Sequence, residues 1–491
     1  MGRTSRVALV TFENEIAWGV RSIAELLRSR GVDVPLYFLE RYTNIPHGVP
    51  EMTLNCFLED FAPRSGDVVG ISFTTPHLET ARTLAGKVKG RGALVVVGGI
   101  HPTILPGDCT PFADYVIRGA GEDAMLALLE ALESENPPDK GVFYKGDEFW
   151  FNEDVTQLPY PRYGDEADNI IVGGRLSRTY KVPRRIGPIT RYQTFTSFGC
   201  PYSCTYCVNP LLHVLSKRYG KKFLRRRSIE SVIAELRHVK DRIDTVSFED
   251  EDFLIDTDRA MALLDLYQKE INLPFSCLIT PSTLKLESLD RLARRLREAK
   301  CVSIAIGLQS ASPRTAKLFR RPFDLDWLQK VAQAFSRHHI VVTYDVILGN
   351  PFEDETDVSQ TVDAILSLPH PYDINIFYLT FFPGYVLTTK AKEQGIVVGE
   401  SGDTRTPHPN VGLEERIIRL AEIPFIPRGH LRRVYQHRTT RWAQVMVAAL
   451  GRTLLPLWGT RWLAMLRIGW SQPYLIFSIF KQKLSGPAPV G

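Results

Sequence analysis

The chain has 491 residues, a length that favours about three domains, each with its own hydrophobic core. Its apolar fraction of 44% and charged fraction of 23% are typical of an ordinary soluble globular protein. A net charge of +5 is small for this length and gives no reason to expect nucleic-acid binding. Seven cysteines, three of them clustered, do not fit a secreted disulfide framework. The N-terminus lacks a secretory signal, so we expect a cytoplasmic protein.

Short apolar runs alternate with amphipathic stretches from residue 6 to about residue 135. The runs predict strands at Val7–Phe12, Val34–Leu39, Asp67–Phe73, Ala93–Val97 and Tyr115–Ile117. The stretches between them predict helices, which include Ile16–Ser29, Leu78–Lys89 and Asp123–Leu132. This alternation predicts a doubly wound, Rossmann-like parallel sheet, in which ligands bind beyond the carboxyl ends of the strands.

The loops after three of these strands contain residues that allow a ligand close to the backbone. Ser72-Phe73-Thr74 follows the third strand, Gly98-Gly99-Ile100-His101 the fourth, and Gly119-Ala120-Gly121-Glu122 the fifth. Paired glycines permit positive φ angles and leave room for a bulky ligand. A single glycine-rich turn of this kind is a weak signal, because many such folds need one merely to turn.

Together, these loops resemble the cobalamin-binding domain that precedes many radical S-adenosylmethionine (SAM) cores, over most of 130 residues. The resemblance implies cobalamin bound by residues in the three loops, namely Ser72, Thr74, Gly98, Gly99, His101, Gly119, Gly121 and Glu122. Two departures from the family matter. Ala120 stands where an acidic residue is usual, and the Asp-x-His-x-x-Gly motif is absent, which implies cobalamin without a protein histidine on cobalt.

We expect residues 1–140 to form this first domain, 141–188 a connector and 189–395 a second α/β domain. The second domain shows six strand candidates, at Thr194–Phe198, Thr245–Phe248, Phe275–Ile279, Val302–Ile306, Val341–Ile347 and Asn375–Leu379. Helical stretches separate them, among them Ile229–Lys240, Asp258–Lys269, Leu286–Ala299, Leu325–Arg337 and Asp357–Leu366. Six such units predict a partial (β/α)6 barrel with its functional residues at the strand carboxyl ends.

Three cysteines, Cys200, Cys204 and Cys207, directly follow the first of these strands in a CxxxCxxC arrangement. A [4Fe–4S] cluster held by these three thiolates would keep one iron open to an outside ligand. Two other interpretations exist. His213 could complete a Cys3His zinc site, and Cys277 or Cys301 could close an ordinary electron-transfer cluster.

The spacing of the cysteines, with the aromatic Tyr206 before the last one, resembles the radical SAM superfamily. In that family the open iron chelates the amino and carboxylate groups of SAM. Further family-like elements follow in the expected order: Phe248-Glu249-Asp250-Glu251-Asp252, Gly307-Leu308-Gln309-Ser310, Gly349-Asn350-Pro351-Phe352 and Phe382-Pro383-Gly384-Tyr385. The resemblance implies SAM contacts at Tyr206, Asp250, Glu251, Gly307, Gln309 and Ser310, with Asp250 or Glu251 holding the amino group.

Two other segments carry distinctive composition. Seven Lys or Arg residues lie between Lys217 and Arg227, either as a solvated loop or as a site for an anionic group. Residues 396–491 predict a mostly helical region in which tryptophans alternate with arginines, and no run of 18 apolar residues exists there. We expect this region to pack over the barrel mouth, with contact to a membrane surface as the alternative.

The resemblance implies an enzyme that cleaves SAM reductively to a 5′-deoxyadenosyl radical and transfers a methyl group to an unactivated carbon with the help of cobalamin. The alternatives are radical cyclisation, rearrangement or ring contraction without methyl transfer, and a non-catalytic iron–sulfur or zinc protein. The implied cofactors are a [4Fe–4S] cluster, SAM and cobalamin. The expected partners are a reductant such as flavodoxin or ferredoxin and a small-molecule, lipid-like or peptide substrate, but no nucleic acid.

Overall fold

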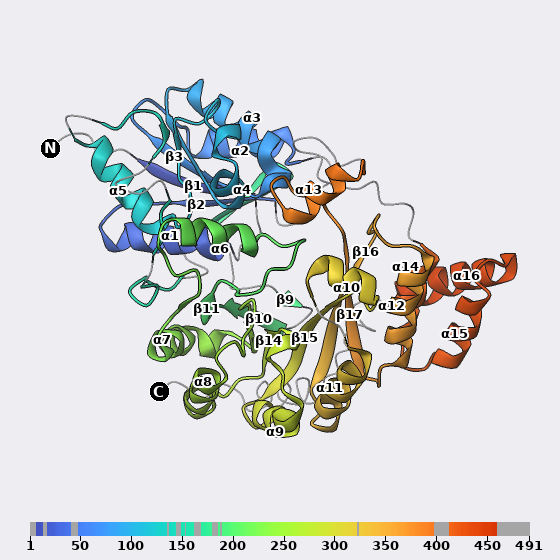
Figure 1. Ribbon diagram of the computed structural model, residues 1–491. Coiled ribbons are helices and arrows are strands. Elements are labelled where there is room, and N and C mark those ends of the chain that lie inside the picture. The colour runs from blue at the N-terminus through green and yellow to red at the C-terminus, as the bar shows by residue number, and fades with distance from the viewer. Residues whose placement is uncertain are drawn as a thin grey trace.

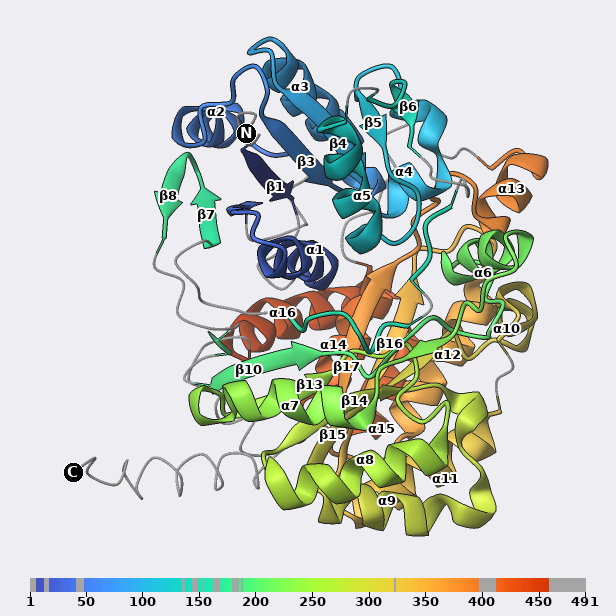
Figure 2. The same cartoon turned by 90° about the vertical axis from the view of Figure 1, so that its left-hand side faces the viewer.

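The structure is a computed structural model. It describes residues 6–12, 17–40, 48–134, 137–143, 149–152, 154–161, 168–178, 185–186, 189–321, 324–396 and 412–458. Figure 2 shows two α/β units, with the N-terminal unit above the C-terminal one. The predicted order of a Rossmann-like domain, a partial barrel and a helical C-terminal region is confirmed.

The first unit is built on an eight-stranded sheet whose central strands are parallel. Its order is β6 (Gly141–Val142), β5 (Tyr115–Val116), β4 (Leu94–Gly98), β3 (Val68–Ser72), β1 (Val7–Thr11), β2 (Leu36–Leu39), β7 (Asp168–Val172) and β8 (Arg175–Ser177). The central strands are apolar runs because helices cover both of their faces. The segment 141–188, which we expect to be a connector, contributes β6, β7 and β8 to this sheet.

Helices of the first unit form two layers. One core joins the sheet to α1 (Trp18–Ser29) and α5 (Glu122–Leu132), and another joins it to α2 (Glu51–Asp60) and α3 (Leu78–Lys89). A short helix, α4 (Ile100–Ile104), follows β4 directly. The sheet therefore presents the carboxyl ends of β1, β3, β4 and β5 along one edge, as the doubly wound fold requires.

The second unit is a half-barrel of six parallel strands, with β9 (Arg185–Ile186) antiparallel at one edge. In chain order the parallel strands are β10 (Ile189–Thr194), β13 (Thr245–Phe248), β14 (Phe275–Ile279), β15 (Cys301–Gln309), β16 (Val341–Leu348) and β17 (Tyr372–Tyr378). The helices that cover them are α7 (Ile229–Val239), α8 (Thr257–Glu270), α9 (Leu289–Glu298), α10 (Pro313–Phe319), α11 (Leu325–Arg337) and α12 (Glu355–Ser367). Side-chain N-caps start several of these helices, at Ser228, Asp256, Ser312, Asp324 and Asp354.

The first barrel strand lies earlier in the chain than its pattern predicts. Residues Thr194–Phe198 read as a strand, yet β10 ends at Thr194 and Ser197–Phe198 form β11, which pairs with β12 (Arg225–Arg226). The chain bends here because the Asp250 carboxylate accepts hydrogen bonds from the Thr196 backbone and from the Ser197 hydroxyl. The Thr196 backbone N–H is therefore bonded to a side chain and does not pair with a neighbouring barrel strand.

The described part of the C-terminal region is helical, with α14 (Leu413–Ala421), α15 (Arg428–Gln436) and α16 (Arg441–Trp458). These helices lie beside α12 at the outer wall of the barrel (Figure 1), and their apolar side chains join the barrel core. The expected packing over the barrel mouth is therefore wrong for these helices, because the edge strand β17 needs an outer cover, which α14 provides. No described helix is long and apolar enough to cross a membrane. Trp462 and Trp470 lie outside the described residues.

Candidate functional site

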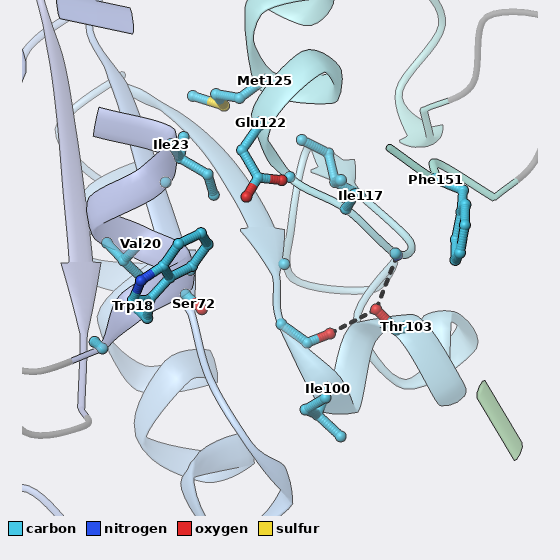
Figure 3. Close-up of a pocket in the computed structure, with 18 of the residues that line it drawn as sticks. Trp18, Val20, Ile23, Ser72, Ile100, Thr103, Ile117, Glu122, Met125 and Phe151 are labelled. Atoms are coloured by element: carbon cyan, nitrogen blue, oxygen red, sulfur yellow. Dashed lines mark hydrogen bonds between the residues drawn. The ribbon is translucent and has the colours of Figure 1, made fainter. Parts of the chain in front are cut away.

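A cavity of about 460 Å³ lies between the two units. The first unit contributes the carboxyl ends of β3, β4 and β5 and the start of α1 and α5 (Figure 3). The second unit contributes Phe195 and Phe198 after β10, Leu212 and Ser216 of helix α6 (Asn209–Arg218), and Arg225 of β12. The edge of the Rossmann-like sheet thus faces residues that flank the cysteine loop on both sides, whereas the three cysteines themselves do not line the cavity.

Hydrogen bonds to one threonine fix the two glycine-rich turns in the cavity wall. Thr103 Oγ1 donates to the Gly99 carbonyl at 2.7 Å and accepts from the Gly119 backbone at 2.9 Å (Figure 3). Gly99 has a φ of +102°, and a Cβ there would lie 2.6 Å from the Phe73 carbonyl oxygen. The position accepts no side chain, so the wall at this turn is bare backbone that a large planar ligand can approach.

Six of the eight residues expected to bind cobalamin line this cavity, namely Ser72, Gly98, Gly99, Gly119, Gly121 and Glu122. Thr74 and His101 lie outside its wall. The His101 ring stacks on Phe73 with centroids 5.6 Å apart, and its Nδ1 lies 3.1 Å from Thr75 Oγ1. Burial lowers the pKa of this imidazole, and the Asp108 carboxylate, 3.5 Å from its Nε2, acts in the opposite direction.

Glu122 and Arg225 are the two charged side chains among the described residues that line the cavity. Burial raises the pKa of Glu122 and lowers that of Arg225. The Arg225 guanidinium lies 4.3 Å from the centre of the Phe151 ring and donates to the Asn152 carbonyl at 3.0 Å. Sequence reasoning missed the aromatic wall, formed by Trp18, Phe149, Phe151, Phe195, Phe198 and Phe223, because its members come from distant segments.

The cysteine loop lies between β11 and α6 and is fixed from several sides. Gly199 has a φ of +93°, and a Cβ there would lie 2.6 Å from the Phe223 carbonyl oxygen. The Thr205 backbone donates to the Phe319 carbonyl at 3.2 Å and accepts from Leu387 at 3.0 Å. Contacts with α10 and with α13 (Val386–Glu393) therefore hold the middle of the loop.

The chemistry of the three thiols fits an iron–sulfur cluster. Burial raises the pKa of Cys200 to about 12, with the neighbouring Cys204 and Cys207 thiols acting in the same direction. Burial also raises the pKa of Cys207. Such thiols stay protonated unless a metal replaces the proton, and three grouped soft donors suit iron–sulfur ligation.

Neither alternative ligand set agrees with the geometry. His213 is exposed and stacks on Phe223, with ring centroids 5.6 Å apart. Cys277 and Cys301 are buried in the barrel core, where their thiols interact with each other. Among the described residues, no three His, Cys, Asp or Glu side chains are close enough together to hold a single metal ion. A [4Fe–4S] cluster needs no such arrangement, because each of its thiolates binds a different iron.

Arg321 is a functional candidate that the sequence did not reveal. Its Nε donates to the Gly307 carbonyl at 2.9 Å, and its Nη1 lies 3.7 Å from Cys204 Sγ. A Cβ at Gly307 would lie 2.7 Å from Arg321 Nη2, so the glycine makes room for the guanidinium. This arginine links the cysteine loop to β15, and no motif in the sequence marks it.

The acidic residues after β13 divide into different roles. Both Asp250 oxygens accept hydrogen bonds from Thr196, at 2.7–3.2 Å, and Oδ1 also accepts from Ser197 at 2.6 Å. Glu251 Oε2 is buried without a hydrogen-bond partner, and burial raises the pKa of this carboxyl. The Glu251 carboxylate in turn contributes to the raised pKa values of Cys200 and Cys207. Burial raises the pKa of Asp252 to about 6.

The remaining residues predicted to contact SAM lie at the end of β15 and beside α10. Ser310 is buried, and its hydroxyl donates to Glu353 Oε1 at 2.7 Å. Gln309 has a left-handed backbone with a φ of +63°. The Tyr206 ring packs edge-on against Phe319, with centroids 4.8 Å apart, so it holds the loop on α10.

Comparisons with known proteins agree with both halves of this architecture. Residues 6–129 match the model of the B12 binding domain, and residues 194–365 match that of the Radical SAM superfamily. The two units thus define a radical SAM protein with an N-terminal cobalamin-binding domain. The chain belongs to the cobalamin-binding branch of the radical SAM superfamily.

Its relatives include several methyltransferases. An uncharacterised methyltransferase of Pyrococcus horikoshii is 27% identical over 62% of this chain and 65% of its own length. The cytidylyl-2-hydroxyethylphosphonate methyltransferase of Streptomyces wedmorensis is 24% identical over 70% of this chain and 72% of its own length. Among solved structures, the radical SAM methyltransferase TsrM from Kitasatospora setae, with cobalamin and a [4Fe–4S] cluster bound, aligns with a TM-score of 0.56 and 17% identity, covering 79% of this chain and 75% of its own.

Proposed function

We propose that this chain is a cobalamin-dependent radical SAM methyltransferase that acts on an unactivated carbon. The observation that carries the proposal is the cavity shared by the two units. Its wall combines the bare turns at Gly99 and Gly119 with Phe195, Phe198 and Arg225, which flank the cysteine loop. A cobalamin held in these turns would lie beside the segments that flank the cysteine loop.

The relatives support methyl transfer over cyclisation or rearrangement. Four relatives carry methyltransferase names, and those names give chemically different substrates, among them a cytidylyl phosphonate and a bacteriochlorophyllide. A magnesium-protoporphyrin ester cyclase matches over 23% of this chain. A small-molecule substrate is therefore part of the proposal.

Each cofactor has a set of residues suited to hold it. Cys200, Cys204 and Cys207 would hold the cluster, which supplies the electron that cleaves SAM. Glu251 would accept hydrogen bonds from the SAM ammonium, because its Oε2 is buried and unpartnered. Asp250 acts through the backbone instead, because its oxygens hold the bend at residues 196 and 197.

The second group of SAM contacts would come from the end of β15. The Gln309 side-chain amide would contact SAM at this edge, whereas the Gly307 carbonyl accepts from Arg321 and the Ser310 hydroxyl positions Glu353. The aromatic side chains of the cavity wall would exclude water from the reacting groups, which protects a radical from quenching.

The test uses anaerobically reconstituted protein, SAM with a deuterated methyl group, and reduced cobalamin. We expect the labelled methyl group to appear on protein-bound cobalamin. When unlabelled SAM is used instead, a product of the cognate substrate should gain ~14 Da for each methyl group transferred. Protein that binds cobalamin and SAM but leaves the label on SAM would contradict the proposal.

A low-potential reductant is a required partner in this proposal, and a reducing cytoplasm is the compartment that we expect for unpaired cysteines.

Contact with a membrane surface through the C-terminal region also stays a prediction. In its described part, α16 exposes Trp442 and Val445, at 51% and 60%. Flotation with anionic vesicles would test it, and protein that stays at the bottom of the gradient would exclude it.

A further inference from the structure

Helix α6 separates the cavity from solvent at the point where the cysteine loop ends. Its inner side, with Leu212 and Ser216, lines the cavity. Its outer side exposes His213 and Val214 and, one turn further on, Lys217 and Arg218. Figure 2 shows α6 at the boundary between the two units, beside α13. The same short helix therefore touches both the site and the solvent.

The structure divides the basic run between Lys217 and Arg227 into two parts. Arg227 is buried in an ion pair with Glu235, at 2.5 Å, Arg225 lines the cavity, and Arg226 lies 3.6 Å from Asp256. The earlier members remain at the surface. Lys217, Arg218 and Lys222 are exposed, and Lys221 is half-buried.

These surface residues form one patch, the α6 surface, made of His213, Val214, Lys217, Arg218, Lys221 and Lys222. Val214 is 66% exposed, and Lys217 and Arg218 lie one helical turn after it on the same side of α6. Four like charges within six residues produce a local positive potential that attracts an acidic partner. An apolar centre with a charged rim is the composition of a transient protein interface.

We infer that the α6 surface is the docking site for a small acidic one-electron carrier protein. The inference rests on the proposed function, because reductive cleavage of SAM consumes an electron. The carrier loses one electron and the enzyme gains it, and no bond is made or broken between them.

The position of α6 suits this role. The helix begins two residues after Cys207, and Val214 lies about 8 Å along the helix axis from its first residue. A carrier centred on Val214 would therefore lie next to the cysteine loop. Its acidic rim would meet Lys217, Arg218 and the two lysines that follow the turn at Gly220.

The test compares two electron donors at low ionic strength, with deoxyadenosine formation as the readout. One donor is reduced flavodoxin, an acidic carrier protein, and the other is reduced methyl viologen, a small cation. The variant is Lys217→Gln/Arg218→Gln/Lys222→Gln. The matched control, Lys285→Gln/Arg291→Gln/Arg294→Gln, removes the same charge from exposed positions in or next to α9, at the bottom of the barrel in Figure 1.

We expect the α6 variant to need about tenfold more flavodoxin for half-maximal rate, and the difference to shrink in high salt, because steering by charge is screened. The rate with methyl viologen should be the same in all three proteins. Equal flavodoxin dependence in all three would overturn the inference and leave the patch for another anionic partner, such as RNA or acidic lipid. Absence of deoxyadenosine with methyl viologen would instead refute the proposed function.

Discussion

Replacement of Arg321 by glutamine should lower the reduction potential of the reconstituted cluster. The Arg321 guanidinium lies 3.7 Å from Cys204 Sγ, so a positive charge is placed where reduction adds an electron. At an effective dielectric constant of about 20, two unit charges at this separation interact by about 4.5 kcal/mol. An electron shared over a cluster lies at roughly twice the distance, which leaves about 2 kcal/mol, or on the order of 100 mV as an upper limit.

We therefore expect Arg321→Gln to shift the midpoint potential downward by about 50–100 mV, and Arg321→Lys to shift it less. Redox titration followed by electron paramagnetic resonance measures this shift in the full-length protein without SAM. Arg320→Gln is the matched control, because Arg320 is adjacent but exposed. A potential that stays within about 20 mV of wild type in Arg321→Gln would refute the assigned role of the guanidinium.

Three further predictions concern the cavity and the acidic run. Gly99→Ala places a Cβ against the Phe73 carbonyl at a positive φ, so cobalamin affinity, measured by absorbance titration, should fall at least about tenfold. The control, Gly107→Ala, has open space around its new Cβ and should bind cobalamin as wild type does. Glu251→Gln should weaken SAM binding in calorimetry with little change in melting temperature, because Glu251 Oε2 has no hydrogen-bond partner to lose. Asp250→Asn should instead lower the free energy of unfolding by about 1–3 kcal/mol, because it disturbs the hydrogen bonds with Thr196. The reverse pattern would show that the two residues have exchanged roles. Because burial raises the pKa of Asp252 from 3.8 to about 6, the folded state holds more protons than the unfolded state between these values, so stability should fall as pH rises through this window. Asp252→Asn should flatten that part of the stability profile, and an unchanged slope would contradict the assignment.

Most of the fold could be predicted from the sequence, because local pattern and tertiary structure agree. The helix Leu78–Lys89 and the strand Phe275–Ile279 have the predicted bounds, since each apolar face is buried by its neighbours. Helix Glu51–Asp60 was not predicted, because it has no side-chain N-cap and no strong signal at its start.

The site was only partly predictable, because motifs mark residues that touch a ligand but not those that support them. Cysteine spacing marks Cys200, Cys204 and Cys207 as the predicted cluster ligands, and glycine pairs mark the turns at Gly99 and Gly119, which line the cavity. The position of Arg321 against Cys204 depends on packing between segments more than 100 residues apart, and no local pattern records it. The same holds for Asp250, whose acidic side chain resembles a ligand but is fully used by Thr196 and Ser197.

The most direct test of the central claim separates the two cofactor sites within one chain. Wild type and a Cys200→Ala/Cys204→Ala/Cys207→Ala variant would be loaded anaerobically with iron, sulfide and cobalamin, then given SAM and reduced methyl viologen. We predict that wild type holds one cluster and one cobalamin and forms deoxyadenosine, whereas the variant keeps cobalamin in the cavity but forms none. Deoxyadenosine from the variant, or none from fully loaded wild type, would contradict the account.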